Sequence, residues 1–175
     1  MPPTWTSCPG CGVELPPNGW TPRSDAMSPE CWELYGEVTA HELIEPALVR
    51  DLHQLTVDAY QTQHPGSNLR GLIYGLVGLH MGLDLGIRGT DVRTAHARMG
   101  PTEPHWPLCA HPPNRGSLTV ADVALAGSPD EHRRLVSEWA GQIWQAWQAS
   151  HDAIARLTQS HVLPLVPEAR RRVQR

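Results

Sequence analysis

The chain has 175 residues, and its 14 basic residues, all arginine, are outnumbered by 18 acidic ones, which gives a formal net charge of −4. A chain of this length can bury roughly 70% of the surface that its unfolded form exposes, so we expect a single domain, residues 1–175, with a real hydrophobic core. The negative charge argues against a general nucleic-acid-binding protein, because phosphate binding depends on surplus positive charge.

The first 27 residues are rich in proline, glycine and tryptophan and have no sustained hydrophobic period, which is typical of an irregular lobe. Cys8 and Cys11 form a CxxC pair around Pro9-Gly10. Such a bend lets two sulfurs reach one ion, and zinc favours four tetrahedral ligands drawn from thiolate and imidazole. The sequence therefore predicts a zinc-binding lobe, residues 1–27, with Zn²⁺ as the cofactor.

A helix is predicted to begin sharply after this lobe. Ser28 can cap the helix, and Pro29 suits its first position. Cys31 then lies in the first turn, where the positive end of the helix dipole favours a thiolate. Cys31 is therefore the third candidate zinc ligand, and the helix continues to about Leu43.

Two more helices are predicted within the three-helix segment 28–87. Pro46 cannot continue the first helix without loss of a hydrogen bond, so it begins a second helix that ends at His64-Pro65-Gly66. A third helix covers 68–86, and its glycines recur every three or four residues, which predicts close packing against another helix. Its apolar stretch 69–85 is only 17 residues long and includes charged side chains, so no membrane span is expected.

Residues 88–117 are predicted to form a long loop, because prolines stand at positions 101, 104, 107, 112 and 113. Long ordered loops often cover or line a site. This loop carries Cys109 and Arg115, which favours a lid or wall of a pocket. A proline-stiffened wrap around the helices is an equal alternative.

Residues 118–163 are predicted to hold the C-terminal helices. A short helix covers 119–126, and Ser128-Pro129-Asp130-Glu131 provides the N-cap, the first-turn proline and the capping-box glutamate of a long helix that runs to about Ser160. Residues 164–175 form a basic tail, most simply a solvated terminus. The predicted fold class is all-α: a helical bundle of four main helices with an irregular N-terminal zinc-binding lobe.

The fourth zinc ligand requires an argument about helix register. Because the connection between the first two helices is short, they should form an antiparallel hairpin in which Cys31 and His64 lie at the same end. His53 should lie about 16 Å farther along its helix than His64, so one ion cannot bind both. His64 is therefore ranked first. The alternatives that remain open are His53, His41 and Cys109.

Dithiol exchange is the main rival interpretation of Cys8 and Cys11. A thioredoxin-type pair needs a helix that opens at its first cysteine, whereas the sequence here continues Val13-Glu14-Leu15-Pro16-Pro17. Metal binding is therefore favoured over redox chemistry. No basic segment followed by an apolar run opens the chain, so the predicted location is the cytoplasm, where a structural disulfide is also disfavoured.

Several motifs together resemble an uncharacterised bacterial family of unknown function. They are Cys8-Pro-Gly-Cys11-Gly, Ser28-Pro-Glu-Cys31-Trp-Glu-Leu-Tyr-Gly-Glu-Val38, His53-Gln-Leu-Thr-Val-Asp58-Ala-Tyr60-Gln-Thr-Gln-His64-Pro-Gly66, Pro112-Pro113-Asn-Arg115-Gly and Glu131-His132. The resemblance implies one specific fold and brings no established activity with it. It also implies that a set of polar residues matters together: His53, Asp58, Tyr60, His64, Arg115 and His132.

Two classes of function remain open. In the first, the protein has a tryptophan- and histidine-lined pocket for a small molecule and carries out hydrolysis or a related polar reaction. An open zinc ion would activate water, but a thiolate-rich Cys₃His site is expected to be structural, so catalysis would use side chains without metal. The candidate catalytic residues are His53, Asp58, Arg115 and His132, with Arg115 and His132 as anchors for an anionic group.

In the second class, the protein is a zinc-stabilised module that binds another protein or has a regulatory role. The lobe and the tryptophan-rich helix would present its contact surface, and a large exposed indole patch would favour this class. The expected partners are thus a small molecule or a protein, and neither nucleic acid nor a membrane is expected.

Overall fold

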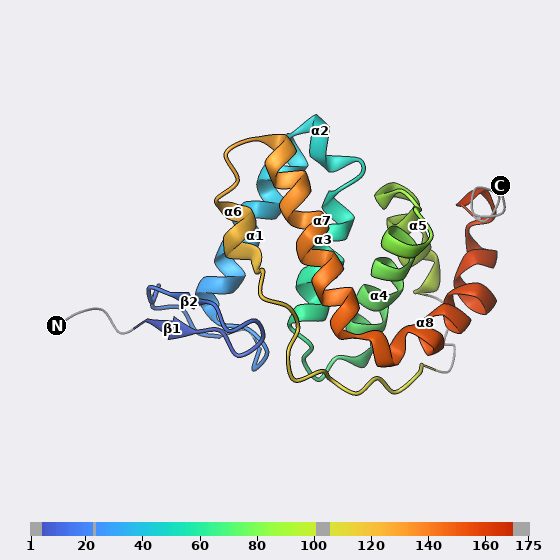
Figure 1. Cartoon of the computed structure of the whole chain (residues 1–175), viewed down its shortest axis with the longest axis horizontal. Coiled ribbons are helices and arrows are strands. Elements are labelled where there is room, and N and C mark those ends of the chain that lie inside the picture. The colour runs from blue at the N-terminus through green and yellow to red at the C-terminus, as the bar shows by residue number, and fades with distance from the viewer. Residues whose placement is uncertain (1–4, 23, 101–105, 170–175) are drawn as a thin grey trace.

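The computed structural model describes residues 5–22, 24–100 and 106–169, and these are mostly helical (Figure 1). The irregular N-terminal segment carries a two-residue antiparallel pair, β1 (Thr6–Ser7) and β2 (Glu14–Leu15). The predicted all-α class with an irregular N-terminal lobe is therefore confirmed. The arginines of the predicted basic tail, at positions 170, 171, 172 and 175, lie outside the described residues.

Helix α1 (Pro29–Ile44) begins where the sequence predicts. The Ser28 hydroxyl accepts a hydrogen bond from the backbone N–H of Cys31, and Pro29 takes the first helical position. Side-chain capping of this kind satisfies an N–H group that the helix itself leaves without a partner. The cap therefore fixes where the helix begins and places Cys31 in its first turn.

The predicted second helix is interrupted and forms two elements, α2 (Pro46–Val49) and α3 (His53–Gln63). The carbonyl oxygens of Arg50 and Asp51, between these two elements, lie against Gly89. A Cβ at Gly89 would be 3.1 Å from the Asp51 oxygen and 3.4 Å from the Arg50 oxygen. The interruption thus contacts a residue distant in the sequence, and the local sequence pattern does not encode such a contact.

Helix α4 (Leu69–Leu79) continues into a π-helical turn, η1 (His80–Asp84), and packs closely against α3. A Cβ at Gly75 would lie 2.7 Å from a methyl carbon of Thr62, and one at Gly78 would collide with the Asp58 carboxylate. The glycine spacing therefore serves the close helix contact that it predicted.

The predicted loop 88–117 is wrong for its first third, because residues Gly89–Met99 form helix α5. Val92, Ala95 and Met99 recur at helical spacing and are buried. The prolines that indicated a loop all follow this helix. From residue 106 to residue 118 the described chain has neither helix nor strand, as predicted.

The C-terminal part begins with α6 (Val120–Ala124), followed by α7 (Pro129–Ala146) and α8 (His151–Leu157). The prediction of one unbroken helix to Ser160 is wrong, since the chain turns at 147–150 and α8 runs away from α7 (Figure 1). The His151 ring stacks on Trp144 with centroids 3.8 Å apart, and its Nε2 donates to the Trp144 carbonyl at 2.8 Å. These contacts form only when the helix turns. Two short elements follow, η3 (Thr158–Val162) and η4 (Leu163–Leu165).

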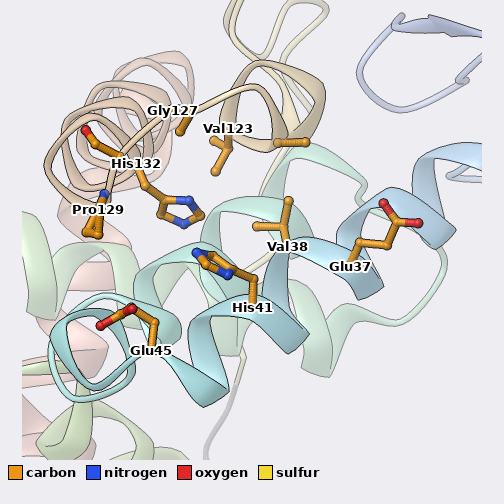
Figure 2. A pocket seen from close by; sticks show the side chains of 11 residues that line it. Glu37, Val38, His41, Glu45, Val123, Gly127, Pro129 and His132 are labelled. Atoms are coloured by element: carbon orange, nitrogen blue, oxygen red, sulfur yellow. The ribbon is translucent and has the colours of Figure 1, made fainter.

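The core lies where α3 packs against both α4 and α7. Trp139 and Trp147 of the α7 region are almost fully buried, and their indole N–H groups donate to the Gln63 side chain at 3.0 Å and to the Thr62 carbonyl at 3.2 Å. These bonds hold the C-terminal end of α3, where His64 follows. A cavity lies between α1, α6 and the start of α7 (Figure 2). None of the helices among the described residues is long and apolar enough to cross a membrane.

Candidate metal centre and buried carboxylate cluster

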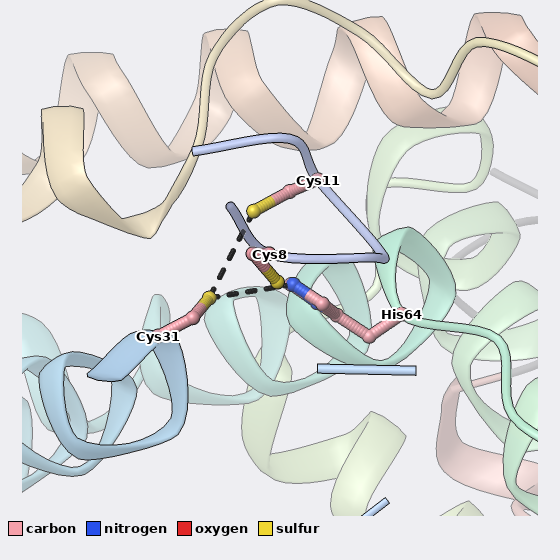
Figure 3. Close-up of side chains that lie close together, drawn as sticks. All are labelled: Cys8, Cys11, Cys31 and His64. Atoms are coloured by element: carbon pink, nitrogen blue, oxygen red, sulfur yellow. Dashed lines mark hydrogen bonds between the residues drawn. The ribbon is translucent and has the colours of Figure 1, made fainter. Parts of the chain in front are cut away.

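Three sulfurs and one imidazole meet where the N-terminal lobe touches the start of α1 and the end of α3 (Figure 3). The residues are Cys8, Cys11, Cys31 and His64, and one ligand atom from each lies within 4.8 Å of the other three. Cys8, Cys31 and His64 are buried and Cys11 is half-buried. Of the predicted alternatives for the fourth position, the structure brings His64 to the three sulfurs.

Two distances between ligand atoms in this cluster are close to those around a tetrahedral zinc ion. The Sγ atoms of Cys11 and Cys31 are 3.8 Å apart, and Sγ of Cys31 is 3.4 Å from Nε2 of His64. Zinc–sulfur bonds of about 2.3 Å and zinc–nitrogen bonds of about 2.0–2.1 Å give a regular tetrahedron S···S edges of about 3.8 Å and S···N edges of about 3.6 Å. The donor set can therefore hold a metal ion that prefers thiolate and imidazole.

The CxxC turn closes through its own backbone. The Gly12 N–H donates to the Cys8 carbonyl at 2.8 Å, and the Cys8 N–H donates to the Val13 carbonyl at 2.9 Å. Gly12 has a φ of 77°, which an L side chain rarely adopts. Gly10 faces the His64 ring so closely that a Cβ there would collide with it. Gly12 thus allows the backbone of the turn, and Gly10 allows the turn to approach His64.

Neighbouring groups orient the ligand atoms. Nδ1 of His64 lies 2.7 Å from the Tyr60 carbonyl, so this nitrogen donates its proton there and leaves Nε2 to face the sulfurs. The Tyr60 hydroxyl donates to Sγ of Cys31 at 3.6 Å. The backbone N–H of Ser28 donates to Sγ of Cys8 at 3.5 Å. The sulfurs and the imidazole are therefore held in place by the protein itself.

The three thiols hold their protons unequally. Hydrogen bonds from the thiols of Cys11 and Cys31 hold the pKa of Cys8 far below its ordinary range. Hydrogen bonds that the Cys31 thiol makes to Cys11 and Cys8 raise the pKa of Cys31. Because the thiolate is the form that binds a metal, binding at this cluster is coupled to release of protons.

Arg115 joins the CxxC turn to two other segments. Its Nη2 donates to the Gly10 carbonyl at 2.7 Å, Nε donates to the Gln63 carbonyl at 2.8 Å, and Nη1 donates to the Pro112 carbonyl at 2.9 Å. Burial lowers the pKa of Arg115. The structure therefore places Arg115 at the candidate metal centre, and it does not bring this residue to His132.

A second polar cluster is buried between α1, α3 and α7 and centres on Glu42, which has no exposed surface. One carboxylate oxygen accepts hydrogen bonds from Thr56 Oγ1 at 2.5 Å and from His132 Nε2 at 2.8 Å. The other oxygen lies 3.0 Å from His53 Nδ1. His53 and His132, which the sequence indicated as members of one set, thus meet on one carboxylate.

Glu42 itself was missed in the sequence. Its position carried a signal, because Cys31, Val38 and Glu42 recur at spacings of seven and four along α1 and all three are buried. This pattern marks one face of a helix. A glutamate on such a face is normally taken as solvated, since charged residues are rarely fully buried without a partner.

Asp58 lies apart from that cluster. Its Oδ1 accepts from Gln54 Nε2 at 3.0 Å and is 3.9 Å from His96 Nδ1, and its Oδ2 is buried with no partner among the described residues. Burial raises the pKa of Asp58 well above its ordinary value and lowers the pKa of His96 to about 4. The structure therefore pairs Asp58 with His96 and Gln54, and it does not bring Asp58 to His53 or His132.

The cavity beside the Glu42 cluster has a volume of about 440 Å³. Figure 2 shows the rings of His41 and His132 next to each other in its lining. Their centroids are 5.8 Å apart. The expected tryptophan lining is wrong for this cavity, because no residue that lines it is a tryptophan. Trp139 and Trp147 contribute to the core instead.

Comparison with known proteins identifies a family for this chain. The model of a family of unknown function, DUF5946, matches residues 6–148. The match covers most of the chain, so the protein belongs to this family, and the expected resemblance to an uncharacterised family is confirmed. Neither a curated protein nor a solved structure matches the chain significantly.

Proposed function

We propose that this member of the DUF5946 family is a zinc protein in which Cys8, Cys11, Cys31 and His64 form a closed structural site. The site fastens the N-terminal lobe to α1 and to the end of α3. What supports this role most directly is that three sulfurs and one imidazole nitrogen lie within 4.8 Å of one another, and that two of their separations, 3.8 and 3.4 Å, are close to the edges of a zinc tetrahedron. The softness of three thiolates favours zinc over magnesium, calcium or manganese.

A structural role is favoured over a catalytic one. Four protein ligands leave no position for water or substrate, and three thiolates weaken the Lewis acidity that hydrolysis needs. The residues around the ligands also support a structural role, because Tyr60 and Arg115 hold the ligand-bearing segments together through hydrogen bonds.

The metal content of the purified protein tests this proposal. We expect one zinc ion per chain, its loss in Cys31→Ser, and its retention in Cys109→Ser, a matched control whose sulfur lies outside the cluster. Removal of the ion with a chelator should lower the melting temperature of the wild type. Stoichiometric zinc and unchanged stability in Cys31→Ser would refute the proposal.

A second measurement separates a closed site from an open one. Cobalt can replace zinc, and its visible absorption reports a tetrahedral thiolate environment. For a closed site, azide added to the cobalt protein should leave this spectrum unchanged. A change would mean that a small ligand reaches the metal and that the catalytic alternative holds.

We also propose that the cavity between α1 and α7 binds a small molecule. The supporting observation is the Glu42–His132 pair at its edge, since a carboxylate that accepts a hydrogen bond from Nε2 leaves Nδ1 of the imidazole as a base. Such a base suits hydrolysis and other polar reactions that do not need the metal. His53 supports the same carboxylate from the other side.

A zinc-stabilised interaction module is the alternative, in the cytoplasm, where thiolates stay reduced. Trp5 and Trp20 in the N-terminal lobe are each 59% exposed, which favours contact with another protein. The variants Trp5→Ala and Trp20→Ala should keep zinc and the fold while they lose a partner found by cross-linking in cells. Cross-links that persist in both variants would count against this surface.

A further inference from the structure

We infer that the cavity between α1 and the start of α7 recognises a small organic cation, whose N–H group donates to Nδ1 of His132 and whose charge faces the carboxylates of Glu37 and Glu45. This inference rests on the proposed small-molecule site and names the class of its ligand. A primary ammonium or amidinium group on a compact apolar body fits the description.

The acceptor in this site is an imidazole nitrogen that the protein leaves without a bond. Only 5% of the His132 side chain is exposed, and its Nε2 is engaged by Glu42 at 2.8 Å. In the described part of the chain no donor bonds its Nδ1. Figure 2 shows the His132 ring projecting from α7 toward His41, at the edge of the cavity. Because His132 lines the cavity, a ligand there can donate a hydrogen bond to an acceptor that the described residues leave free.

Glu42 acts as a positioning residue. Thr56 and His53 hold its carboxylate, which has no exposed surface, so the carboxylate cannot turn away from His132. An acceptor at Nε2 fixes the imidazole tautomer that has its lone pair on Nδ1. The negative charge behind the ring also strengthens that lone pair as an acceptor for a positively charged donor.

The charge of the lining selects a cation. Glu37 and Glu45 line the cavity, and no arginine among the described residues does. Arg133, the neighbour of His132 in the sequence, donates instead to the Ala47 carbonyl at 2.7 Å. An anion would therefore meet two carboxylates with no cation opposite them. The expected anchoring of an anionic group by His132 and Arg115 is thus not what this cavity favours.

The start of α7 does not reverse this preference. A helix N-terminus attracts anions through free N–H groups. Here Ser128 caps the Glu131 N–H, Pro129 has no N–H, and the Glu131 carboxylate accepts from the Gly127 N–H at 2.8 Å. The positive end of the helix is thus already compensated by the protein's own groups.

The remaining walls set the size and polarity of the ligand. Val38, Val123, Ala124 and Pro129 contribute apolar surface. A volume of about 440 Å³ lies within the range of small-molecule sites, roughly 300–1,000 Å³. The ligand therefore combines one cationic donor end with a small apolar body.

Three probes of nearly equal shape and different charge test this inference: benzylamine, benzyl alcohol and benzoate. Each is titrated into the full-length protein, and the imidazole carbon-bound protons are followed by NMR. We expect benzylamine to shift the His132 and His41 signals, with an affinity about tenfold above that of benzyl alcohol, and benzoate to bind more weakly than either.

Variants of the two glutamates that line the cavity show whether their charge causes the preference for benzylamine. Glu37→Gln and Glu45→Gln should each weaken benzylamine binding several-fold and leave benzyl alcohol unchanged. Glu138→Gln, on an exposed part of α7 where the carboxylate pairs with Arg134, is the matched control and should change neither. His132→Ala removes a donor from buried Glu42 and costs stability, so the Glu37→Gln and Glu45→Gln variants provide the decisive comparison.

The possible results separate the ligand class from the site itself. Binding of benzyl alcohol or benzoate as tight as that of benzylamine would overturn the cationic class and leave a small-molecule site in place. Histidine signals that no probe moves, even at tens of millimolar, would overturn both. Zinc content is measured independently and bears on neither result.

Discussion

Nη2 of Arg115 lies 2.7 Å from the carbonyl oxygen of Gly10, although 105 residues separate the two in the sequence. The bond connects the turn between Cys8 and Cys11 to the segment that precedes α6. Because the same guanidinium also binds the Gln63 carbonyl, next to His64, Arg115 holds two ligand-bearing segments at a fixed separation.

Replacement of Arg115 should therefore weaken metal binding without removal of any ligand. We expect Arg115→Ala to lower zinc affinity by about 10–100-fold, the usual effect of the loss of a group that orients metal ligands. Arg115→Lys should not restore it, because one ammonium cannot match three N–H donors in a fixed plane. Competition with a chromophoric chelator measures the affinity. Arg134→Ala, at an exposed ion pair, is the control, and equal affinities in all variants would contradict the prediction.

The contact between Gly78 and Asp58 makes a second prediction. A Cβ at Gly78 would collide with the buried Asp58 carboxylate, so we expect Gly78→Ala to lower the free energy of unfolding by about 3 kcal/mol. Gly36→Ala, also in a helix but with no atom within 4 Å of the added Cβ, should instead stabilise the protein by about 0.5–1 kcal/mol. Urea unfolding followed by circular dichroism measures both.

A double variant shows whether the carboxylate causes the loss at Gly78. Asp58→Ala removes the colliding atoms, so the cost of Gly78→Ala should be smaller in the Asp58→Ala background than in the wild type. An equal cost in both backgrounds would mean that α4 shifts for another reason.

The candidate metal centre could be predicted from the sequence because its information is local. Cys8 and Cys11 share one turn, Cys31 follows a capped helix start, and the register of a short hairpin brings His64 to the same end. The Glu42 cluster could not be predicted in this way. Its two histidines lie 11 and 90 residues from Glu42, and only the folded chain shows that they satisfy the carboxylate.

The errors in the helix boundaries have a similar origin. The prolines after residue 100 indicate a loop only for the residues that follow α5, whereas Val92, Ala95 and Met99 before them have helical spacing. The turn between α7 and α8 has no proline to mark it. The turn lets His151 stack on Trp144, a contact between two residues that a continuous helix would have kept apart.

Burial of Asp58 predicts an effect of pH on stability. Its pKa is raised in the folded protein, so the folded state holds this proton more tightly than the unfolded chain does. The contribution of Asp58 to the free energy of unfolding is therefore greatest below the unfolded pKa of about 3.9. This contribution falls as the pH rises above that value. Asp58→Asn cannot titrate and keeps an acceptor for Gln54. Its free energy of unfolding relative to the wild type should rise from pH 4 to pH 7, and a difference that stays constant would contradict this.

His96 should give the opposite dependence in an overlapping window. Burial lowers its pKa to about 4, whereas an unfolded histidine titrates near 6.5. The unfolded chain therefore binds a proton that the folded protein excludes, so stability is fully present above about pH 6.5 and decreases by about 3 kcal/mol as the pH falls through 4. His96→Gln should remove this loss, so its stability relative to the wild type should rise as the pH falls.

Because Asp58 and His96 lie 3.9 Å apart and act with opposite sign, the wild type alone shows only a part of either effect. Urea unfolding of both single variants and the double variant at pH 4, 5, 6 and 7 separates them, and a His96→Gln difference independent of pH would refute the assignment.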